Sequence, residues 1–297
     1  MSGLFRLPLG DVAEAVVGFV IDTLGWFFDA LSAVFRSVYD GLDWALSAPP
    51  FWLIILALTA LAYVAKGTWL ALGTAVGLLA IVGVDQWTNA MDSLALVIVA
   101  ASAAVLIAIP VGIWAARNDR VSRAVRPILD LLQTMPAFVY LIPALMLFGV
   151  GPVPGIVATV VFALAPGVRL TELGIRGVDA EVVEAGHAFG ASPARILRQI
   201  QLPLAMPSIM AGVNQVIMLS LSMVVIAGMV GAGGLGGAVV QSLSRIDIAL
   251  GVEAGVSVVI LAIILDRITS AAAAPRRRKR RTRPSARSAP VAAGAAN

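Results

Sequence analysis

One polar segment, residues 179–203, stands between long apolar runs and carries the residue spacing most suggestive of function. Its single histidine, His187, we interpret as a solvated or interface residue rather than a catalytic one. The chemistry that these residues could perform is protein docking. The residues concerned are Glu184, Ala185, Gly186, Gly190, Ile200, Leu202 and Pro203.

Local signals predict a helix, a sharp turn and a second helix in this segment. Asp179 is placed to accept a hydrogen bond from a free backbone N–H and begin the first helix. Gly190 is a natural left-handed stop, and Ser192 with Pro193 favours the start of the second helix. We expect Pro203 to end that helix. Two short helices with an exposed glycine turn, flanked by membrane segments, are typical of a docking element.

The spacing resembles the EAA loop of membrane subunits of ATP-binding-cassette (ABC) importers. That pattern is E-A-A, three residues, G, nine residues, then I-x-L-P, and only Gly186 departs from it, standing where an alanine is usual. The resemblance extends from Arg117 to Thr269 through QTMPAFVYLIP, LAMPSIMAGVNQ, LSMVVIAGMVGAGGLG and VILAIILDRIT. Together these segments resemble the permease of a glycine betaine/proline betaine importer.

The resemblance implies an all-α, polytopic membrane bundle that works as a homodimer with two cytoplasmic ABC ATPase subunits and an external substrate-binding protein. ATP hydrolysis would occur in the partner chain, and this chain would hold no cofactor. The implied cargo is a quaternary-amine osmolyte. Two alternatives stay open: an ABC permease for choline or an amino acid, and a secondary transporter or channel that needs no ATP.

The composition independently indicates a membrane protein. Hydrophobic residues make up 60% of the 297, charged residues 13%, and the mean hydropathy is +0.95, whereas soluble domains carry about 25% charged residues. The chain has no cysteine and one histidine, so a Cys or His metal site is not expected. Eight of its basic residues fall in 276–287, so the positive charge is local and does not indicate nucleic-acid binding.

The motif GAGGLG at 231–236 matches the pattern GxGxxG, but the sequence around it does not predict a dinucleotide site. Such a site needs a strand before the glycines and a helix after them. Here the glycines follow an apolar membrane run, so we expect a closely packed or flexible turn. The chain also lacks a GxxxxGK[ST] loop, and ATP must therefore bind elsewhere.

Seven apolar segments are candidate membrane spans, since about 20 apolar residues cross a bilayer. An uncharged run over 131–168 is too long for one helix, and we expect Gly149–Gly155 to divide it. The candidates are Ala45–Ala65, Gly67–Val84, Leu94–Trp114, the two halves of Leu131–Val168, Leu204–Met229 and Ile248–Leu265. Before them, residues 1–48 combine helical apolar spacing with six acids, which predicts an amphipathic helix lying at the interface.

Arginine clusters predict the orientation. The clusters lie at 117–126, at 169–198 and in the tail. With seven spans and the N-terminus outside the cell, all three lie on the same side of the membrane. Loops rich in basic residues favour the cytoplasmic side. The N-terminus is then outside, and the 179–203 loop and C-terminus are inside. The predicted domains are an interfacial segment at 1–48, a transmembrane permease domain at 49–270 and a disordered basic tail at 271–297, which is also placed to touch anionic lipid.

Polar residues within the spans are candidates for the translocation path. Such side chains either bond between helices or line a water-filled route, and both interpretations remain open here. A proline beside them frees backbone carbonyls, which suits a lined cavity. The candidates are Gln133, Thr134, Met135, Asn214 and Gln215.

Overall fold

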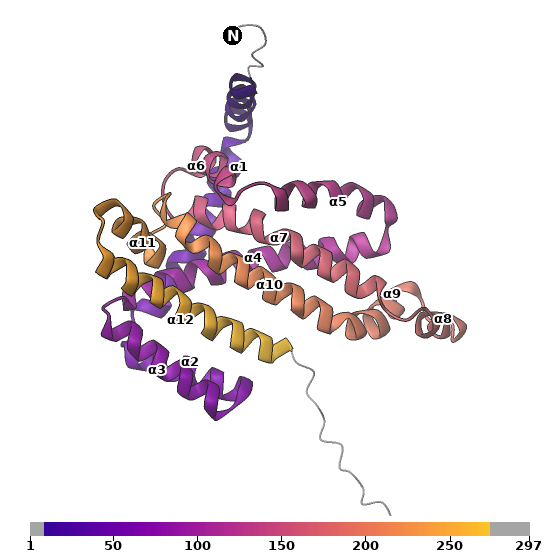
Figure 1. Cartoon of the computed structure of the whole chain (residues 1–297). Coiled ribbons are helices and arrows are strands. Elements are labelled where there is room, and N and C mark those ends of the chain that lie inside the picture. The colour runs from indigo at the N-terminus through magenta and orange to yellow at the C-terminus, as the bar shows by residue number, and fades with distance from the viewer. Residues whose placement is uncertain (1–8, 274–297) are drawn as a thin grey trace, which may run out of the picture.

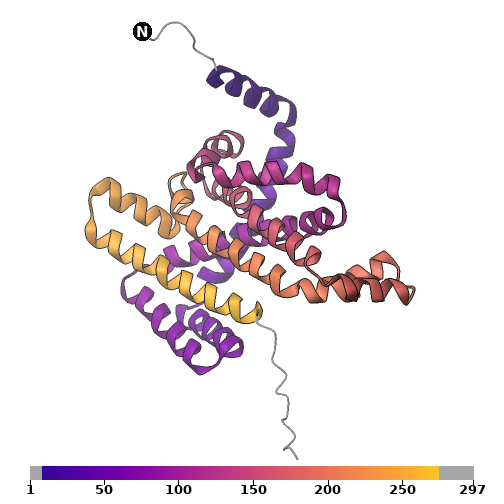
Figure 2. The same ribbon diagram turned by 45° about the vertical axis from the view of Figure 1, so that its right-hand side comes forward.

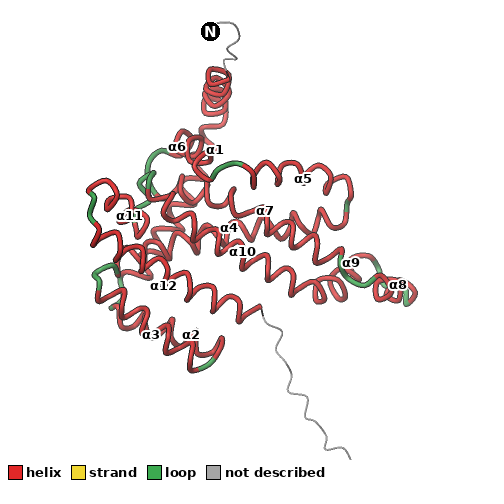
Figure 3. Tube along the Cα trace, in the orientation of Figure 1, coloured by secondary structure: helices red, strands yellow, loops and turns green. Residues whose placement is uncertain are grey.

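The computed structural model describes residues 9–273, and every regular element in that range is helical, which confirms the all-α prediction (Figures 1 and 3). The elements are α1 (Leu9–Ser47), α2 (Phe51–Lys66), α3 (Thr68–Gly83), α4 (Trp87–Arg117), α5 (Asp119–Thr134), η1 (Ala137–Tyr140), α6 (Leu141–Phe148), α7 (Pro152–Arg176), α8 (Ala180–Ala188), α9 (Pro193–Ile196), η2 (Leu197–Gln201), α10 (Leu202–Gly228), α11 (Gly234–Arg245) and α12 (Ile248–Ala273).

Helices α4, α7 and α10 pack together as the centre of the bundle. Their shared faces are rich in small residues, such as Ala100, Ala104 and Ala163, which are fully buried. A Cβ added to Gly112 of α4 would lie 2.6 Å from Cβ of Thr171 on α7. Small residues let helix backbones approach closely, and close packing replaces the hydrophobic effect between helices in lipid.

The predicted count of seven membrane spans is not reproduced. Five helices are long and apolar enough to cross a membrane, or six if the bent pair of 119–134 and 137–148 is one span. Two predicted spans fall on α2 and α3, which have 16 residues each and are not counted, whereas α1 is counted although it was not among the predicted seven. At 1.5 Å per residue, α2 and α3 each reach only about 24 Å, short of the roughly 30 Å hydrocarbon core. They form a short hairpin, and Gly77 of α3 faces Ile260 of α12.

The segment expected to span the membrane from residue 131 is not one straight helix. Helix α5 ends at Thr134, and the two halves of the pair meet at 109°. Proline explains the break, because it supplies no N–H and forces the preceding residue into an extended conformation. Met135, directly before Pro136, has φ −71° and ψ 135°. The break at Pro136 was not predicted, whereas the break predicted at Gly149–Gly155 is confirmed: Gly149 and Gly151 have positive φ, and Pro152 begins α7.

Helix α1 also meets the length and hydropathy criteria for a span, over Val17–Ser47. In Figures 1 and 2, however, α1 runs across the direction shared by α7, α10 and α12 rather than along it. Phe35, Tyr39 and Leu42 of α1 pack against the central core, and Phe28 contacts Phe148 of α6. The crossing direction favours the interfacial placement, which stays a prediction.

The Gly231–Gly236 segment is a tight turn between two helices. It follows α10 and leads into α11, so no strand precedes it. A Cβ on Gly236 would lie 2.0 Å from the carbonyl oxygen of Val224, and the backbone N–H of Leu235 donates to Ser93 Oγ at 2.8 Å. The close-packed turn expected from the sequence is therefore present, and it fixes α11 against α10 and α4.

Candidate functional site

The first half of the 179–203 loop is built from local capping signals. Asp179 begins α8 and accepts a hydrogen bond from the backbone N–H of Glu181 at 2.9 Å. Gly190 follows α8 with φ +73°. Its N–H donates to the carbonyl of His187 at 2.9 Å, and the N–H of Ala191 donates to that of Gly186 at 3.1 Å. These two hydrogen bonds together form a Schellman motif, which needs a residue in the left-handed conformation at the position of Gly190.

The second half of the loop begins as predicted but does not end as predicted. Ser192 precedes α9 and Pro193 is its first residue, although the serine side chain makes no capping hydrogen bond. We expected Pro203 to stop this helix. Instead the helical path runs from Pro193 to Gly228 through a π-helical turn, η2, and Pro203 is the second residue of α10, which follows that turn. The wider π turn accommodates a residue that cannot donate an N–H, so the loop joins α10 without a break.

The predicted coupling residues divide into two groups. Glu184, Ala185 and Gly190 are exposed on the outer surface of the loop. Gly186 is buried, and a Cβ there would meet Ile200 Cδ1 at 2.8 Å and Ile196 Cγ1 at 3.4 Å. The glycine that departs from the family pattern thus lets α8 pack closely on the second helix.

Of the remaining two coupling residues, Leu202 is partly buried in the base of the loop, and Pro203 is exposed. Phe189 was not among the predicted coupling residues, although its side chain is 92% exposed at the tip of the loop. An aromatic ring of that exposure beside the glycine turn is an apolar contact point. Its signal in the sequence was its position directly before Gly190.

The loop projects from one end of the bundle but is firmly seated there (Figure 1). Ile175, Leu197, Ala205 and Ile209 form a buried cluster that joins the end of α7 to the start of α10. A cavity of about 280 Å³ separates the loop from the helix ends behind it. Its lining residues are Ala116, Arg117, Ile175, Arg176, Val183, His187, Pro193, Ile196 and Gln201. The ends of α4 and α7 therefore form the platform of the loop.

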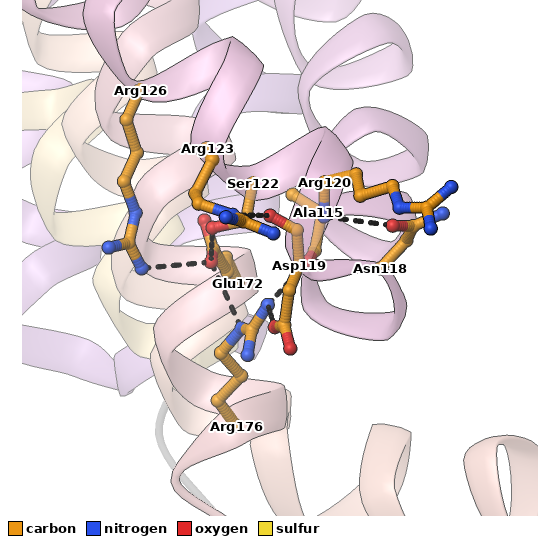
Figure 4. Close-up of polar contacts among 9 residues, drawn as sticks. All are labelled: Ala115, Asn118, Asp119, Arg120, Ser122, Arg123, Arg126, Glu172 and Arg176. Atoms are coloured by element: carbon orange, nitrogen blue, oxygen red, sulfur yellow. Dashed lines mark hydrogen bonds and ion pairs between the residues drawn. The ribbon is translucent and has the colours of Figure 1, made fainter.

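Behind this platform, a buried carboxylate gathers polar groups from α5 and α7 (Figure 4). Glu172 Oε1 accepts from Ser122 Oγ at 2.6 Å and lies 3.0 Å from Arg176 Nε and 3.3 Å from Arg126 Nη2. We call these four residues, with Asp119, the Glu172 cluster. The cluster was not predicted because its members span 57 positions of the chain, from Asp119 to Arg176, and belong to two separate helices.

The predicted path residues are not brought together. Asn214 bonds between helices: its amide donates to Asp266 Oδ1 at 3.2 Å, and its Oδ1 accepts from Thr269 Oγ1 at 2.7 Å. Met135 packs instead near Met223, nine residues further along α10 from Asn214, or about 13 Å along the axis. Gln133, Thr134 and Gln215 are exposed. For Asn214 the structure supports the packing interpretation.

Comparison with known proteins agrees with this arrangement. The family described as "Binding-protein-dependent transport system inner membrane component" matches residues 108–279. The chain is 45% identical over 269 residues to the glycine betaine transport system permease protein OpuAB of Bacillus subtilis, covering 91% of this chain and 95% of the relative. It is also 45% identical to the glycine betaine/proline betaine permease protein ProW of Escherichia coli, covering 89% and 75%.

A solved structure has the same fold. The inward-facing MetNI methionine ABC transporter matches with a TM-score of 0.57 and 25% sequence identity, covering 63% of this chain and 95% of the other. The family match spans more than half of the chain and includes the loop, the Glu172 cluster, the end of α4 and all of α7 and α10. An ATPase and a binding protein are implied as partners by membership of such a system. The chain belongs to the binding-protein-dependent transport system inner membrane components, the multi-pass membrane subunits of ABC importers whose ATPase is a separate chain.

Proposed function

We propose that this permease translocates quaternary-amine osmolytes of the glycine betaine and proline betaine type, and that the 179–203 loop couples it to the ATPase. Identity of 45% across nine-tenths of the chain to a glycine betaine permease carries the substrate assignment. The exposed surface of the loop, with Phe189 at its tip, supports the coupling assignment.

The proposal includes the assembly. A homodimer of permeases would hold two cytoplasmic ATPase subunits at the loops and receive substrate from an external binding protein. ATP binding would move the loops, and the central helices would switch between outward and inward access. Such a switch requires the loop to interact differently with the ATPase in its two states. The central helices, α4, α7 and α10, belong to the proposed permease domain at 49–270, with the interfacial segment at 1–48 before it. The predicted tail, 271–297, lies mostly outside the described residues.

Uptake by the reconstituted transporter tests the substrate. Proteoliposomes holding the permease, its ATPase and its binding protein should accumulate radiolabelled glycine betaine only when ATP is supplied. Unlabelled proline betaine should compete, and an amino acid such as methionine should not. Unlabelled choline should be tested as a separate competitor, because a choline permease of Bacillus subtilis is 34% identical over 57% of this chain. Uptake that continues without ATP would contradict the importer and favour a secondary transporter or channel.

The proposed orientation places the N-terminus outside and the C-terminus in the cytoplasm. The loop shares one end of the bundle with Arg117 and Arg176, which supports a cytoplasmic location by the positive-inside rule. The residues between α3 and α4 should then lie outside. Reporter fusions after Asp85 and after Thr269 should report opposite sides of the membrane. If both fusions report the cytoplasm, this orientation is wrong.

A further inference from the structure

The carboxylate of Glu172 joins two helices at the end of the bundle nearest the loop. Its side chain is 8% exposed and lies on α7, while Ser122 and Arg126 belong to α5. Each of the three recorded polar contacts of Glu172 is made by the same oxygen, Oε1. Burying a carboxylate costs free energy unless the charge is paired and hydrogen-bonded. Here two guanidinium groups pair with the charge, and a hydroxyl donates a hydrogen bond to it.

Arg176 extends this link toward the loop. Besides its contact with Glu172, it lies 2.7 Å from Asp119 Oδ1 and donates to the carbonyl oxygen of Ala115 at 2.8 Å. Arg176 is the last residue of α7, and the cap of α8, Asp179, follows three positions later. It also lines the cavity behind the loop. Polar contacts therefore run from α5 through Glu172 to the residue that connects α7 with the loop.

The far end of α5 carries two of the predicted path residues, Gln133 and Thr134. Further along α5, Leu129 packs against the apolar side chains of Ala165 and Val168, and then α5 ends at the bend after Thr134. Apolar contacts permit small shifts of one helix along another, whereas a buried charged cluster specifies one register. The Glu172 cluster is the buried charged contact between α5 and α7.

We propose that Glu172 is a positioning residue for transport: it fastens α5 to the loop end of α7, so that α5 moves with the loop when the ATPases close. The inference rests on the proposed coupling function of the loop. Contiguous polar networks with discrete arrangements are one physical route for such coupling. Glu172 would not touch the ATPase, and its loss would separate hydrolysis from transport without releasing the ATPase.

A second ion pair between the same helices provides a matched control. Arg169 of α7 pairs with Asp130 of α5, but both side chains are open to solvent, at 40% and 66% exposure. Exposed ion pairs contribute little, and this pair has no recorded contact with Arg176. Asp130→Asn should therefore leave transport near the parental level.

The test uses the reconstituted transporter with its ATPase and binding protein. Glu172→Gln keeps the side-chain size and removes the charge. We expect retained ATPase on co-purification, near-parental basal hydrolysis, and at least a tenfold lower ratio of betaine transported to ATP hydrolysed. A residue with a merely structural role would lower the amount of transporter in the membrane and leave that ratio unchanged. Ser122→Ala removes one hydrogen bond and should lower the ratio several-fold.

A labelling experiment reports the position of α5 directly. The chain contains no cysteine, so one cysteine at the exposed position Ala124 gives a single maleimide site on α5. Its labelling rate in the parent should differ between the nucleotide-free and the ATP-and-vanadate-trapped complex. In Glu172→Gln the two rates should become equal.

Several outcomes would overturn the inference. A parental transport-to-hydrolysis ratio in Glu172→Gln, or the same nucleotide-dependent labelling as in the parent, would do so while leaving the proposed function intact. If Glu172→Gln does not accumulate in the membrane, a parental ratio in Ser122→Ala would overturn it instead. Absence of ATP-dependent uptake by the parent itself would overturn both the proposed function and this inference.

Discussion

Gly236→Ala is expected to destabilise the bundle strongly, so that much less permease accumulates in the membrane. The added Cβ would lie 2.0 Å from the carbonyl oxygen of Val224 and 2.8 Å from its carbonyl carbon. These are backbone atoms inside α10, which cannot rotate aside as the end of a side chain can. The contact is mutual, because a Cβ on Gly228 of α10 would lie 2.3 Å from the carbonyl carbon of Gly236.

The expected magnitude follows from the required movement of a whole helix. Overpacking a core by one methyl group typically costs about 1–3 kcal/mol through side-chain and backbone shifts. Here α11 must move away from α10, and that movement also strains the hydrogen bond from Leu235 N–H to Ser93 Oγ. We therefore expect a cost at or above the upper end of that range, a large part of a typical folding stability of roughly 5–15 kcal/mol.

The neighbouring glycine provides the control. A Cβ on Gly237 would meet nothing within 4 Å, so Gly237→Ala adds the same methyl group in the same helix without a clash. Membrane abundance by immunoblot and thermal stability in detergent should be near parental for Gly237→Ala and strongly reduced for Gly236→Ala. Equal abundance and stability of the two variants would show that the backbones of α10 and α11 lie further apart at Gly236 than they do in the structure.

Features set by neighbouring residues were predictable from the sequence. The cap at Asp179, the left-handed Gly190 and the break at Gly149–Gly151 are all present. Each depends on a few adjacent residues whose backbone preferences are strong, because a side-chain cap or a positive φ is a local requirement. The all-helical membrane bundle was predictable for a related reason, since composition and apolar run length decide it.

Features set by tertiary contacts were not predictable. Uncharged runs suggested full spans where α2 and α3 form a short hairpin, since hydropathy does not report where a helix turns back. Pro203 was expected to stop a helix, but the π-helical turn before it accommodates a residue without a backbone N–H, and the helix continues. The Glu172 cluster joins residues 122, 126, 172 and 176 across a helix interface, and one sequence without an alignment carries no signal for such a pairing.

Gly190→Asp is expected to abolish ATP-driven uptake while the membrane bundle still folds. Gly190 has φ +73°, a conformation that costs a residue with a side chain roughly 1 kcal/mol. Aspartate tolerates that conformation better than most residues, and a Cβ at this position would meet nothing within 4 Å. The loop also projects from the end of the bundle (Figure 2), so the central helices should remain intact.

The larger effect should come from the new charge at the proposed ATPase contact. Gly190 adjoins Phe189, whose 92% exposed ring would be buried by a docked ATPase. An unpaired charge buried in such a contact costs several kcal/mol, and every 1.4 kcal/mol lowers affinity tenfold. We therefore expect more than a tenfold loss of ATPase on co-purification, with permease abundance near parental. Glu184→Ala should be milder, because it removes an exposed charge near the start of α8.

Gly190→Asn separates the charge from the backbone strain. Asparagine matches aspartate in size and also tolerates the left-handed conformation, so the two variants differ mainly in charge. Co-purified ATPase and uptake should fall slightly in Gly190→Asn and more than tenfold in Gly190→Asp. Equal losses in both variants would assign the effect to the conformation or size of the turn. Full ATPase retention together with full uptake in Gly190→Asp would show that the 179–203 loop is not the coupling element.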